Sequence, residues 1–334
     1  MKNIARYFVC SIWMMIIFVS CEKSIIKEEA QHPAAVFESL WNVMDTKYAL
    51  FSYKKANWKE VYNKYRPMVS DNISNQELFD ICTAMLGELA DGHVALINGA
   101  QKYTYSGYYS AYPHNFNFDL LKEKYLPDIK SQGIMSYAFP GQYGYLYIPS
   151  FSDGLTLADI DLALEKLAHV QGLIIDVRDN SGGGSAKVDR IVERLLPKKM
   201  LLKYDIYKHG PGHDDFYPPQ AKYLEPRNSI LAGKPLLVLT NRRCFSSCND
   251  FVLYMSELPN VLVIGDQTGG GGGTPFDYEL PNGWGLKYSA SMAVSAAGVN
   301  IEDGIAPDYF VSNSMEDESK GRDAIFKFAL EHLQ

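Results

Sequence analysis

Three short apolar runs constrain the fold of this chain more than any other feature; they span residues 172–177, 235–240 and 261–265. None of them alternates apolar with polar residues, which is the pattern of strands buried on both faces. Segments of helical periodicity alternate with these runs, at 155–170, 186–196 and 246–258. Strands and helices in this order predict an α/β fold whose central sheet is mostly parallel.

The chain ahead of these runs has a different pattern. Apolar residues recur at helical spacing between residues 34 and 90, and Ser74 followed by Glu77 predicts a capping box at the start of one helix. Residues 94–112 alternate like a strand, whereas residues 113–140 have no clear pattern. A small helical domain is therefore expected to precede the α/β region.

These patterns divide the chain into five predicted segments. They are a signal peptide at 1–20, a tether at 21–33, a helical domain at 34–93, a short β-rich connecting segment at 94–140 and an α/β core at 141–334. Within the core, we expect a strand at 143–151, a hairpin at 275–295 with its turn at 281–283, and a closing helix at 324–333.

The N-terminus has the pattern of a secretory signal. Lys2 and Arg6 precede an apolar stretch at 8–19, too short to span a membrane comfortably, and Ser20-Cys21 follow at once. A small residue followed by cysteine is typical of a bacterial lipoprotein cleavage site. This predicts lipidation of Cys21 and anchoring in the cell envelope, on its periplasmic face or at the cell surface. An ordinary secretory signal with an incidental cysteine is the alternative.

Charge and cysteine content exclude some classes of function. The formal net charge of −7 gives no electrostatic support to nucleic-acid binding. Apart from Cys10 and Cys21 in the N-terminal segment, the chain has Cys82, Cys244 and Cys248, which make no disulfide framework and no zinc-binding pattern. Cys244 and Cys248 are four residues apart and could form a disulfide, but helical spacing does not favour one, so we expect both to be small buried residues. We expect no metal site.

Two stretches of the α/β region suit nucleophilic catalysis. Ser246 and Ser247 fall where a strand gives way to a helix, and a helix start offers free N–H groups and the positive end of its dipole. The run DVRDNSGGG at 176–184 also follows a strand, and is either an anion-binding loop or a tight connection. The glycine run at 269–273 could cradle a phosphate, but we favour a mobile loop bordering a cleft.

Five motifs stand in a recognisable order: DGH at 91–93, DVRDNSGG at 176–183, CFSSCND at 244–250, GDQTGG at 265–270 and EDGIAPD at 302–308. In this order they resemble the tail-specific (C-terminal-processing) and tricorn-type serine peptidase family. The resemblance covers most of the chain after residue 34. It implies a ClpP/crotonase-like α/β core with a small N-terminal helical domain.

The resemblance implies a role for each matching residue. Ser246 matches the nucleophile, with Ser247 as its competitor. The backbone N–H of Ser247 would be one oxyanion donor, and Gly182 or Gly183 would supply the second.

The base distinguishes two branches of the family. Processing peptidases use a lysine where this chain has Gly271, and no lysine lies between residues 261 and 286. The tricorn-type branch uses a histidine, which His93 matches, and a histidine serves as a base near neutral pH without strong desolvation. Glu302 matches the acid that orients it.

The chain departs from the family pattern in three places. Asn249 stands where a glutamate is usual, and Gly92 replaces a serine that precedes the tricorn-type histidine. Residues 101–140 are too few for the PDZ module that many relatives carry.

The resemblance thus implies a serine endopeptidase that cleaves peptides or unfolded proteins in the cell envelope, without a metal or other cofactor. Two alternatives remain, a catalytically inactive ligand-binding homologue and an esterase or amidase with the same triad. The sequence determines neither the substrate nor the oligomeric state.

Overall fold

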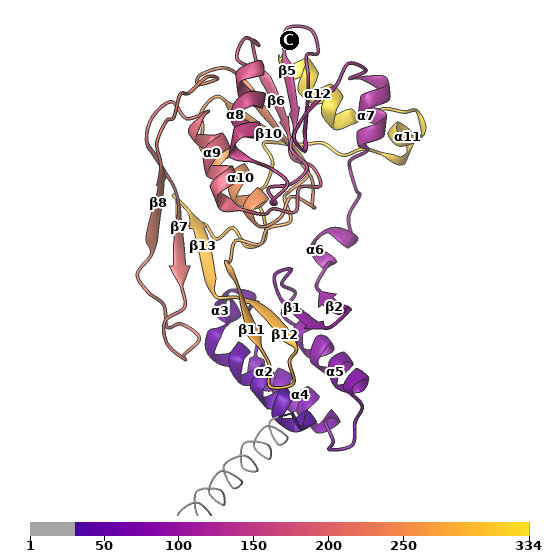
Figure 1. Cartoon of the computed structure of the whole chain (residues 1–334), viewed down its shortest axis with the longest axis vertical. Helices are drawn as coiled ribbons and strands as arrows, with labels where there is room; N and C mark the ends of the chain where they lie inside the picture. The colour runs from indigo at the N-terminus through magenta and orange to yellow at the C-terminus, as the bar shows by residue number, and fades with distance from the viewer. Residues whose placement is uncertain (1–30, 334) are drawn as a thin grey trace, which may run out of the picture. The chain divides into compact units, whose positions relative to one another are not determined.

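The computed structural model describes residues 31–333 (Figure 1). The predicted signal peptide, the predicted lipidation site Cys21 and most of the predicted tether lie outside these residues. In the described part of the chain, no helix is both long and apolar enough to cross a membrane.

The chain forms two compact units that do not follow the predicted linear boundaries. Among the described residues, unit 1 takes in the chain up to Tyr105 together with Gly210–Asp215 and Pro275–Ser289, and the remaining segments form unit 2. The predicted core at 141–334 is therefore interrupted. The cause is strand pairing, because Leu286 in the predicted hairpin pairs with Leu96 rather than with a strand of the core.

Unit 1 packs helices against a small antiparallel sheet. Its helices are α2 (Pro33–Lys47), α3 (Phe51–Lys54), α4 (Trp58–Tyr65), the 3₁₀ helix η1 (Arg66–Met68) and α5 (Asn75–Gly87). Its strands are β1 (Ala95–Asn98), β2 (Gln101–Thr104), β11 (Pro275–Glu279) and β12 (Gly285–Ser289), in the order β11-β12-β1-β2. The capping box of Ser74 and Glu77 is confirmed at the start of α5, which contacts α2, α4 and β1.

Unit 2 is built on a larger sheet. Its strands are β3 (Lys130–Gln132), β4 (Met135–Ala138), β5 (Gly144–Tyr147), β6 (Leu173–Asp176), β9 (Leu236–Thr240), β10 (Val261–Gly265) and β14 (Tyr309–Phe310). Their order across the sheet is β14-β10-β9-β6-β5-β4-β3. The strands from β5 to β14 pair in parallel, which confirms the prediction from the uninterrupted apolar runs.

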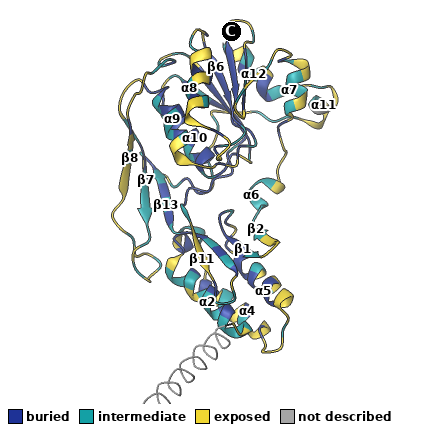
Figure 2. Cartoon of the chain, in the orientation of Figure 1, coloured by how far each residue is buried: buried dark blue, intermediate teal, exposed yellow. Residues whose placement is uncertain are grey.

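Helices cover both faces of this sheet. They are α8 (Leu157–Lys166), α9 (Ser185–Glu193) and α10 (Ser247–Ser256) on one face, and α7 (Phe118–Lys124) and α12 (Ala324–Leu333) on the other. Unit 2 also contains the short helices α6 (Gly107–Ser110) and α11 (Met315–Ser319). Ile175 packs in one core with α8, α9 and α10, whereas its neighbour Ile174 packs in the other with α7 and α12. Successive residues of a strand point to opposite faces, so β6 is buried on both sides, as Figure 2 shows.

A second sheet of unit 2 was not predicted from the sequence. It is antiparallel, in the order β13-β7-β8, with strands β7 (Met200–Tyr207), β8 (Gln220–Leu224) and β13 (Ser291–Ser295). The predicted hairpin at 275–295 is thus split, because β13 pairs with β7 while β11 and β12 belong to unit 1.

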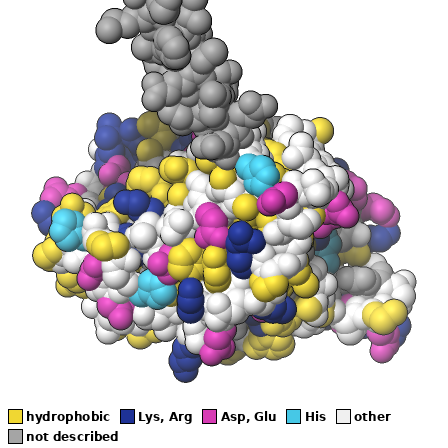
Figure 3. All heavy atoms as spheres, turned by 90° about the horizontal axis from the view of Figure 1, so that it is seen from below, with side chains coloured by type: hydrophobic (Ala, Val, Ile, Leu, Met, Phe, Trp, Pro, Cys, Tyr) yellow, Lys and Arg dark blue, Asp and Glu magenta, His cyan; other side chains and the backbone are white. Residues whose placement is uncertain are grey.

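Surface charge is mixed in sign. On the face drawn in Figure 3, acidic and basic side chains of the described residues are interspersed with hydrophobic ones, and no extended basic field is visible. Nucleic-acid binding therefore gains no support from this face.

A buried arginine holds the loop after β6. Arg178 is fully buried, and its guanidinium donates to both Asp176 and Asp323, with closest N–O distances of 2.7 and 2.9 Å. Burial alone would lower the pKa of this guanidinium, but the two carboxylates raise it, so Arg178 stays charged. Asp323 also accepts the N–H of Phe326 in α12, so one carboxylate links the C-terminal helix to the loop.

We predict that Asp323→Asn lowers the free energy of unfolding by about 3 kcal/mol, because it leaves a buried guanidinium half-compensated. Chemical denaturation followed by circular dichroism measures this. Lys327→Ala is the matched control on the same helix, since it breaks only an exposed pair with Glu331 and should cost about 0.5 kcal/mol or less. If Asp323→Asn lowers the free energy of unfolding by less than about 1 kcal/mol, the ion pairs of Arg178 with Asp176 and Asp323 are not essential to the fold.

Candidate active site

Ser246 lies in a strained turn between β9 and α10. It is the N-cap residue of α10, with φ 60° and ψ −125°, a backbone conformation that side-chain-bearing residues rarely adopt. Such strain persists only where the surrounding structure over-determines it, and it is concentrated at functional sites. The turn presents Ser246 at the start of a helix, as the sequence predicts.

Hydrogen bonds from two loops fix this turn. The Ser246 N–H donates to Gly270 O at 2.9 Å, and the Phe245 N–H donates to Asn180 O at 3.2 Å. Gly269 N–H donates in turn to Cys244 O at 2.7 Å. The nucleophile candidate is therefore held between the loop after β6 and the glycine run.

Two backbone N–H groups near Ser246 are suited to hold an oxyanion. A Cβ added at Gly182 would lie 3.0 Å from Ser246 Cβ and 3.0 Å from Ser247 N, so the glycine loop passes directly beside the helix start. The Gly182 N–H itself donates to Asn180 Oδ1 at 2.9 Å. Of the two predicted glycines, Gly183 is thus the one whose N–H has no acceptor among the described residues.

The environment of the two serines favours Ser246 as the nucleophile. Ser247 is the first residue of α10 and is buried, whereas Ser246 is partly exposed. The N–H of Ser247 has no acceptor within the described residues, as expected for the first turn of a helix. Ser247 therefore suits the role of backbone donor better than that of attacking group.

Two backbone hydrogen bonds, made by the successive glycines Gly270 and Gly271, link Ser246 to Glu302. Gly270 O accepts the Ser246 N–H, and the next N–H, of Gly271, donates to Glu302 O at 2.9 Å. The Glu302 side chain is buried, and its Oε2 accepts the N–H of Gly272 at 3.0 Å. The glycine run thus connects the serine and the acid in one loop cluster.

This glycine run is tightly packed rather than a loose loop bordering a cleft. It is buried throughout, and a Cβ at Gly270 would lie only 1.8 Å from Glu302 O. A Cβ at Gly271 would lie 2.5 Å from the ring of Phe245, and Gly271 has a positive φ of 78°. Glycine is required here by close packing and backbone conformation.

Asn249 holds the loop that carries Glu302. Its Nδ2 donates to Ile301 O at 3.0 Å, and its Oδ1 accepts the hydroxyl of Thr268 at 2.6 Å. The same hydroxyl oxygen accepts the N–H of Ile305 at 2.7 Å. Asparagine supplies both a donor and an acceptor at this position, which a glutamate would not do.

His93 lies in unit 1, in the turn between α5 and β1. It is buried, and its N–H donates to Asp91 Oδ1 at 2.7 Å. Tyr48 and Ser289 donate their hydroxyls to the other oxygen of Asp91, at 3.0 and 2.9 Å. Burial lowers the pKa of His93, Asp91 opposes this and Lys287 adds to it. The imidazole is therefore neutral at neutral pH.

The predicted site residues are divided between the two units. Unit 2 brings together Ser246, Ser247, Glu302 and the Gly182–Gly183 pair. His93 belongs to unit 1, so its role as the base stays a prediction.

The two lysines that are candidates for a base both form ion pairs with carboxylates. Lys203 pairs with Asp205 and Asp250, each at 2.9 Å, and these carboxylates raise its pKa although burial lowers it. It therefore stays protonated and cannot accept a proton at neutral pH. Lys287 pairs with Asp277 at 2.9 Å within unit 1.

Two residues of the site region received no role from the sequence. Asn180 donates to Ile148 O and accepts the Gly182 N–H, so it shapes the glycine loop. Arg178 fixes the same loop, because its guanidinium donates to Asp323, which lies 145 residues away in the sequence. The spacing Asp-x-Arg-x-Asn marks both positions, but their partners are distant in the sequence.

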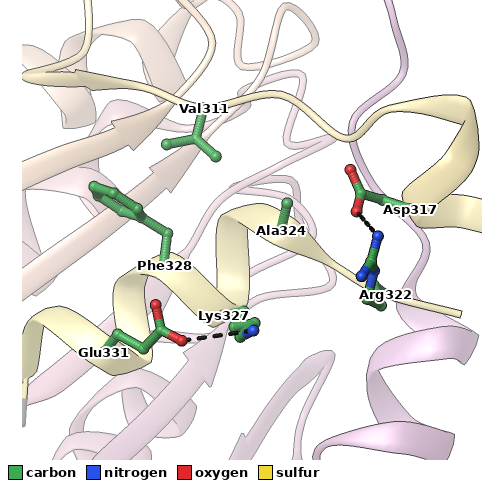
Figure 4. A pocket seen from close by; sticks show the side chains of 7 residues that line it. All are labelled: Val311, Asp317, Arg322, Ala324, Lys327, Phe328 and Glu331. Carbon is green, nitrogen blue, oxygen red and sulfur yellow. Dashed lines mark ion pairs between the residues drawn. The ribbon is translucent and has the colours of Figure 1, made fainter. Parts of the chain in front are cut away.

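Other features of unit 2 do not resemble a catalytic site. Among the described residues, no group of three His, Cys, Asp or Glu side chains could hold a metal ion. A groove of about 300 Å³ lies between α12 and the segment that follows β14 (Figure 4). Its charges pair with one another, Asp317 with Arg322 and Lys327 with Glu331, and no predicted site residue lines it.

Comparison with family models gives two matches. The model of peptidase family S41 matches residues 142–311, which is half of the chain. The model of the tricorn protease C1 domain matches residues 29–87.

Curated relatives are similar to the chain over part of their own length. The chloroplastic C-terminal processing peptidase of Tetradesmus obliquus is 27% identical over 170 residues, which are 50% of this chain and 34% of that protein. The tricorn protease of Thermoplasma acidophilum is 25% identical over 196 residues, 58% of this chain and 17% of that protein. The chain thus spans about a third of these relatives or less.

Solved structures match over nearly the whole chain. A candidate peptidase from Parabacteroides merdae has a TM-score of 0.85 and 41% identity, covering 90% of this chain and 96% of that one. Mature CPAF complexed with lactacystin has a TM-score of 0.72 and 12% identity, covering 91% and 98%, and this likeness shows the fold alone. These matches confirm the predicted mixed α/β fold with its N-terminal helical region.

Proposed function

Because the chain belongs to peptidase family S41, we propose that it is a serine peptidase with Ser246 as its nucleophile. One observation carries the proposal. Ser246 is strained at a helix start and lies beside the glycine loop at Gly182. The N–H groups of Ser247 in this helix start and of Gly183 in this loop have no acceptor among the described residues. This arrangement suits a tetrahedral intermediate, whose negative oxygen needs preorganised donors.

In the proposed reaction, Ser246 Oγ attacks the peptide carbonyl carbon while His93 accepts the hydroxyl proton. The carbonyl π electrons move to oxygen, and the Ser247 and Gly183 N–H groups hold the resulting oxyanion. Collapse of the intermediate expels the amine, to which His93 returns the proton. Water then hydrolyses the acyl-enzyme by the same steps, and no metal or cofactor is needed.

The choice of His93 as base rests on residues of this chain. Lys203 is held protonated by two carboxylates, and Gly271 leaves no side chain where the processing branch has its lysine. Burial lowers the pKa of His93, which keeps the imidazole in the neutral form that can accept a proton. Glu302 is proposed to orient His93, as the acid does in other triads.

We propose peptides or unfolded proteins as substrates. The matched curated relatives are named as C-terminal processing peptidases and tricorn protease, which supports a peptide bond as the target. Residues 101–140 are too few for a PDZ domain, so true tail specificity is not part of the proposal.

Two alternatives use the same fold. An esterase or amidase would need the same serine and the same oxyanion donors, and only a substrate panel separates it from a peptidase. A ligand-binding homologue without catalysis would keep the fold but not a reactive serine.

We predict that a fluorophosphonate probe labels the wild-type protein at Ser246, because an activated serine attacks phosphorus as it attacks a carbonyl. Labelling is read by in-gel fluorescence and the modified peptide by mass spectrometry. Ser246→Ala and His93→Ala should each lower labelling by at least about 100-fold.

Matched controls are Ser256→Ala, which changes a serine of the same helix, and His169→Ala. Both should label like the wild type. Absence of labelling in the wild type would favour the ligand-binding alternative, and full labelling of His93→Ala would remove His93 as the base. Hydrolysis of esters but not of peptides would favour the esterase.

The labelling rate should fall at acid pH with a midpoint below 6.5, the ordinary pKa of histidine, because the neutral imidazole is the base and burial lowers the pKa of His93. Lys287→Gln removes a positive charge that also lowers this pKa, so the midpoint should move upward, toward 6.5. Rates measured from pH 4.5 to 9 test this. A midpoint above 7 in the wild type would instead indicate a base of higher pKa.

We further propose that the protein is anchored in the cell envelope through a lipid on Cys21, on the strength of the N-terminal sequence alone. Metabolic labelling with an alkyne-bearing fatty acid should mark the wild type and not Cys21→Ser. The wild type should sediment with membranes and Cys21→Ser should not. Equal incorporation in both proteins would favour the ordinary secretory signal.

A further inference from the structure

A tyrosine-rich segment lies against the turn that carries the nucleophile. Residues 106–112, here named the tyrosine strap, begin unit 2 and include the short helix α6. The strap carries Tyr108, Tyr109 and Tyr112. Its sequence was expected to be strand-like, and no role was assigned to it.

Each of the three tyrosines contacts a residue just before Ser246. The ring of Tyr108 stacks on Phe245, with centroids 4.4 Å apart and planes 21° apart. The guanidinium of Arg243 lies over Tyr109 at 4.6 Å, and that of Arg242 lies over Tyr112 at 4.0 Å. All three partners belong to the turn between β9 and α10.

Tyr108 covers two parts of the site at once. A Cβ added at Gly269 would lie 2.6 Å from the Tyr108 ring, so the ring packs on the glycine run as well as on Phe245. Phe245 is itself buried and packs on Gly271. The aromatic pair therefore packs between the nucleophile turn and the glycine run at 269–273, whose N–H groups donate to Glu302.

The backbone of Ser246 needs such support. Its positive φ is a strained state, and without restraint from its neighbours the residue would relax to an ordinary conformation. The hydrogen bond from Ser246 to Gly270 fixes one side, but it depends on the position of the glycine run. Stacking between Tyr108 and Phe245 fixes the residue directly before Ser246, and aromatic pairs add stability beyond the area they bury.

We propose that the tyrosine strap positions the nucleophile, with Tyr108 as the positioning residue that holds Phe245, and thereby Ser246, in its reactive conformation. The proposal rests on Ser246 being the nucleophile. The ring carries this role rather than the hydroxyl, because the Tyr108 hydroxyl makes no hydrogen bond with the described residues. Burial raises the pKa of this hydroxyl to about 12, which keeps it neutral.

The test uses the rate of labelling by fluorophosphonate-rhodamine, a small probe that reports the reactivity of the serine with few substrate contacts. Tyr108→Ala should lower the second-order rate constant roughly 10- to 100-fold, as expected for a misplacement of the nucleophile by about 1 Å. Tyr108→Phe keeps the ring and should stay within about twofold of the wild type, because the hydroxyl is not needed. Tyr223→Ala is the matched control, since Tyr223 is an exposed tyrosine that likewise lies beside a basic side chain, Lys199.

Thermal unfolding of each variant separates positioning from loss of fold. Should Tyr108→Ala fail to fold, Tyr108→Leu keeps the bulk without a flat ring and should still react at least about fivefold more slowly than Tyr108→Phe. Equal rates for Tyr108→Ala and the wild type, both folded, would overturn the proposal. So would a loss confined to the KM of a peptide substrate with labelling unchanged, which would make the strap a substrate-binding element. If the wild type itself is not labelled, the proposed function fails rather than the role of the strap.

Discussion

The ion triad of Arg178, Asp176 and Asp323 is the interaction on which the site of unit 2 depends. A guanidinium buried away from solvent stays charged at a low cost in free energy only when carboxylates compensate it. Here two carboxylates do so, and the guanidinium fixes the chain segments to which they belong. Here it fixes the end of β6 and the start of α12. Because Arg178 is fixed, the loop that follows β6 has little conformational freedom. Asn180, two residues after Arg178, can therefore shape the glycine turn by accepting the Gly182 N–H.

From that anchor, backbone contacts build the rest of the cluster. Asn180 O accepts the Phe245 N–H, Gly270 O accepts the Ser246 N–H, and Glu302 O accepts the Gly271 N–H. At Gly270 and Gly271 the loops pack too closely for a side chain, which explains why glycine stands at these positions. The strain at Ser246 is the result of these restraints acting together, and the hydrogen bonds and packing around it offset its cost.

The sequence predicted the parts of the fold that follow from local patterns. Uninterrupted apolar runs gave the parallel strands β6, β9 and β10, and the capping box at Ser74 was confirmed. Strands β7 and β8 were missed, and the segment at 275–295 was assigned to one hairpin although β13 pairs with β7. Pairing between distant strands has no local signature, and neither does the partnership of Arg178 with a carboxylate 145 residues away. The serine, the acid and the glycine loop could be named as candidates because they lie in motifs, and unit 2 brings them together.

The packing of the glycine run also explains why a lysine base does not suit this chain. At Gly271 the backbone has a positive φ, and any Cβ would clash with the ring of Phe245. The ring of Tyr108 stacks on that same ring. A lysine there would displace the aromatic pair and, with it, the turn that carries Ser246. The same packing that holds Ser246 therefore removes the space in which a lysine side chain at residue 271 would sit. Under the proposed function the base comes from elsewhere in the chain, and burial lowers the pKa of His93, which keeps its imidazole in the neutral form that accepts a proton.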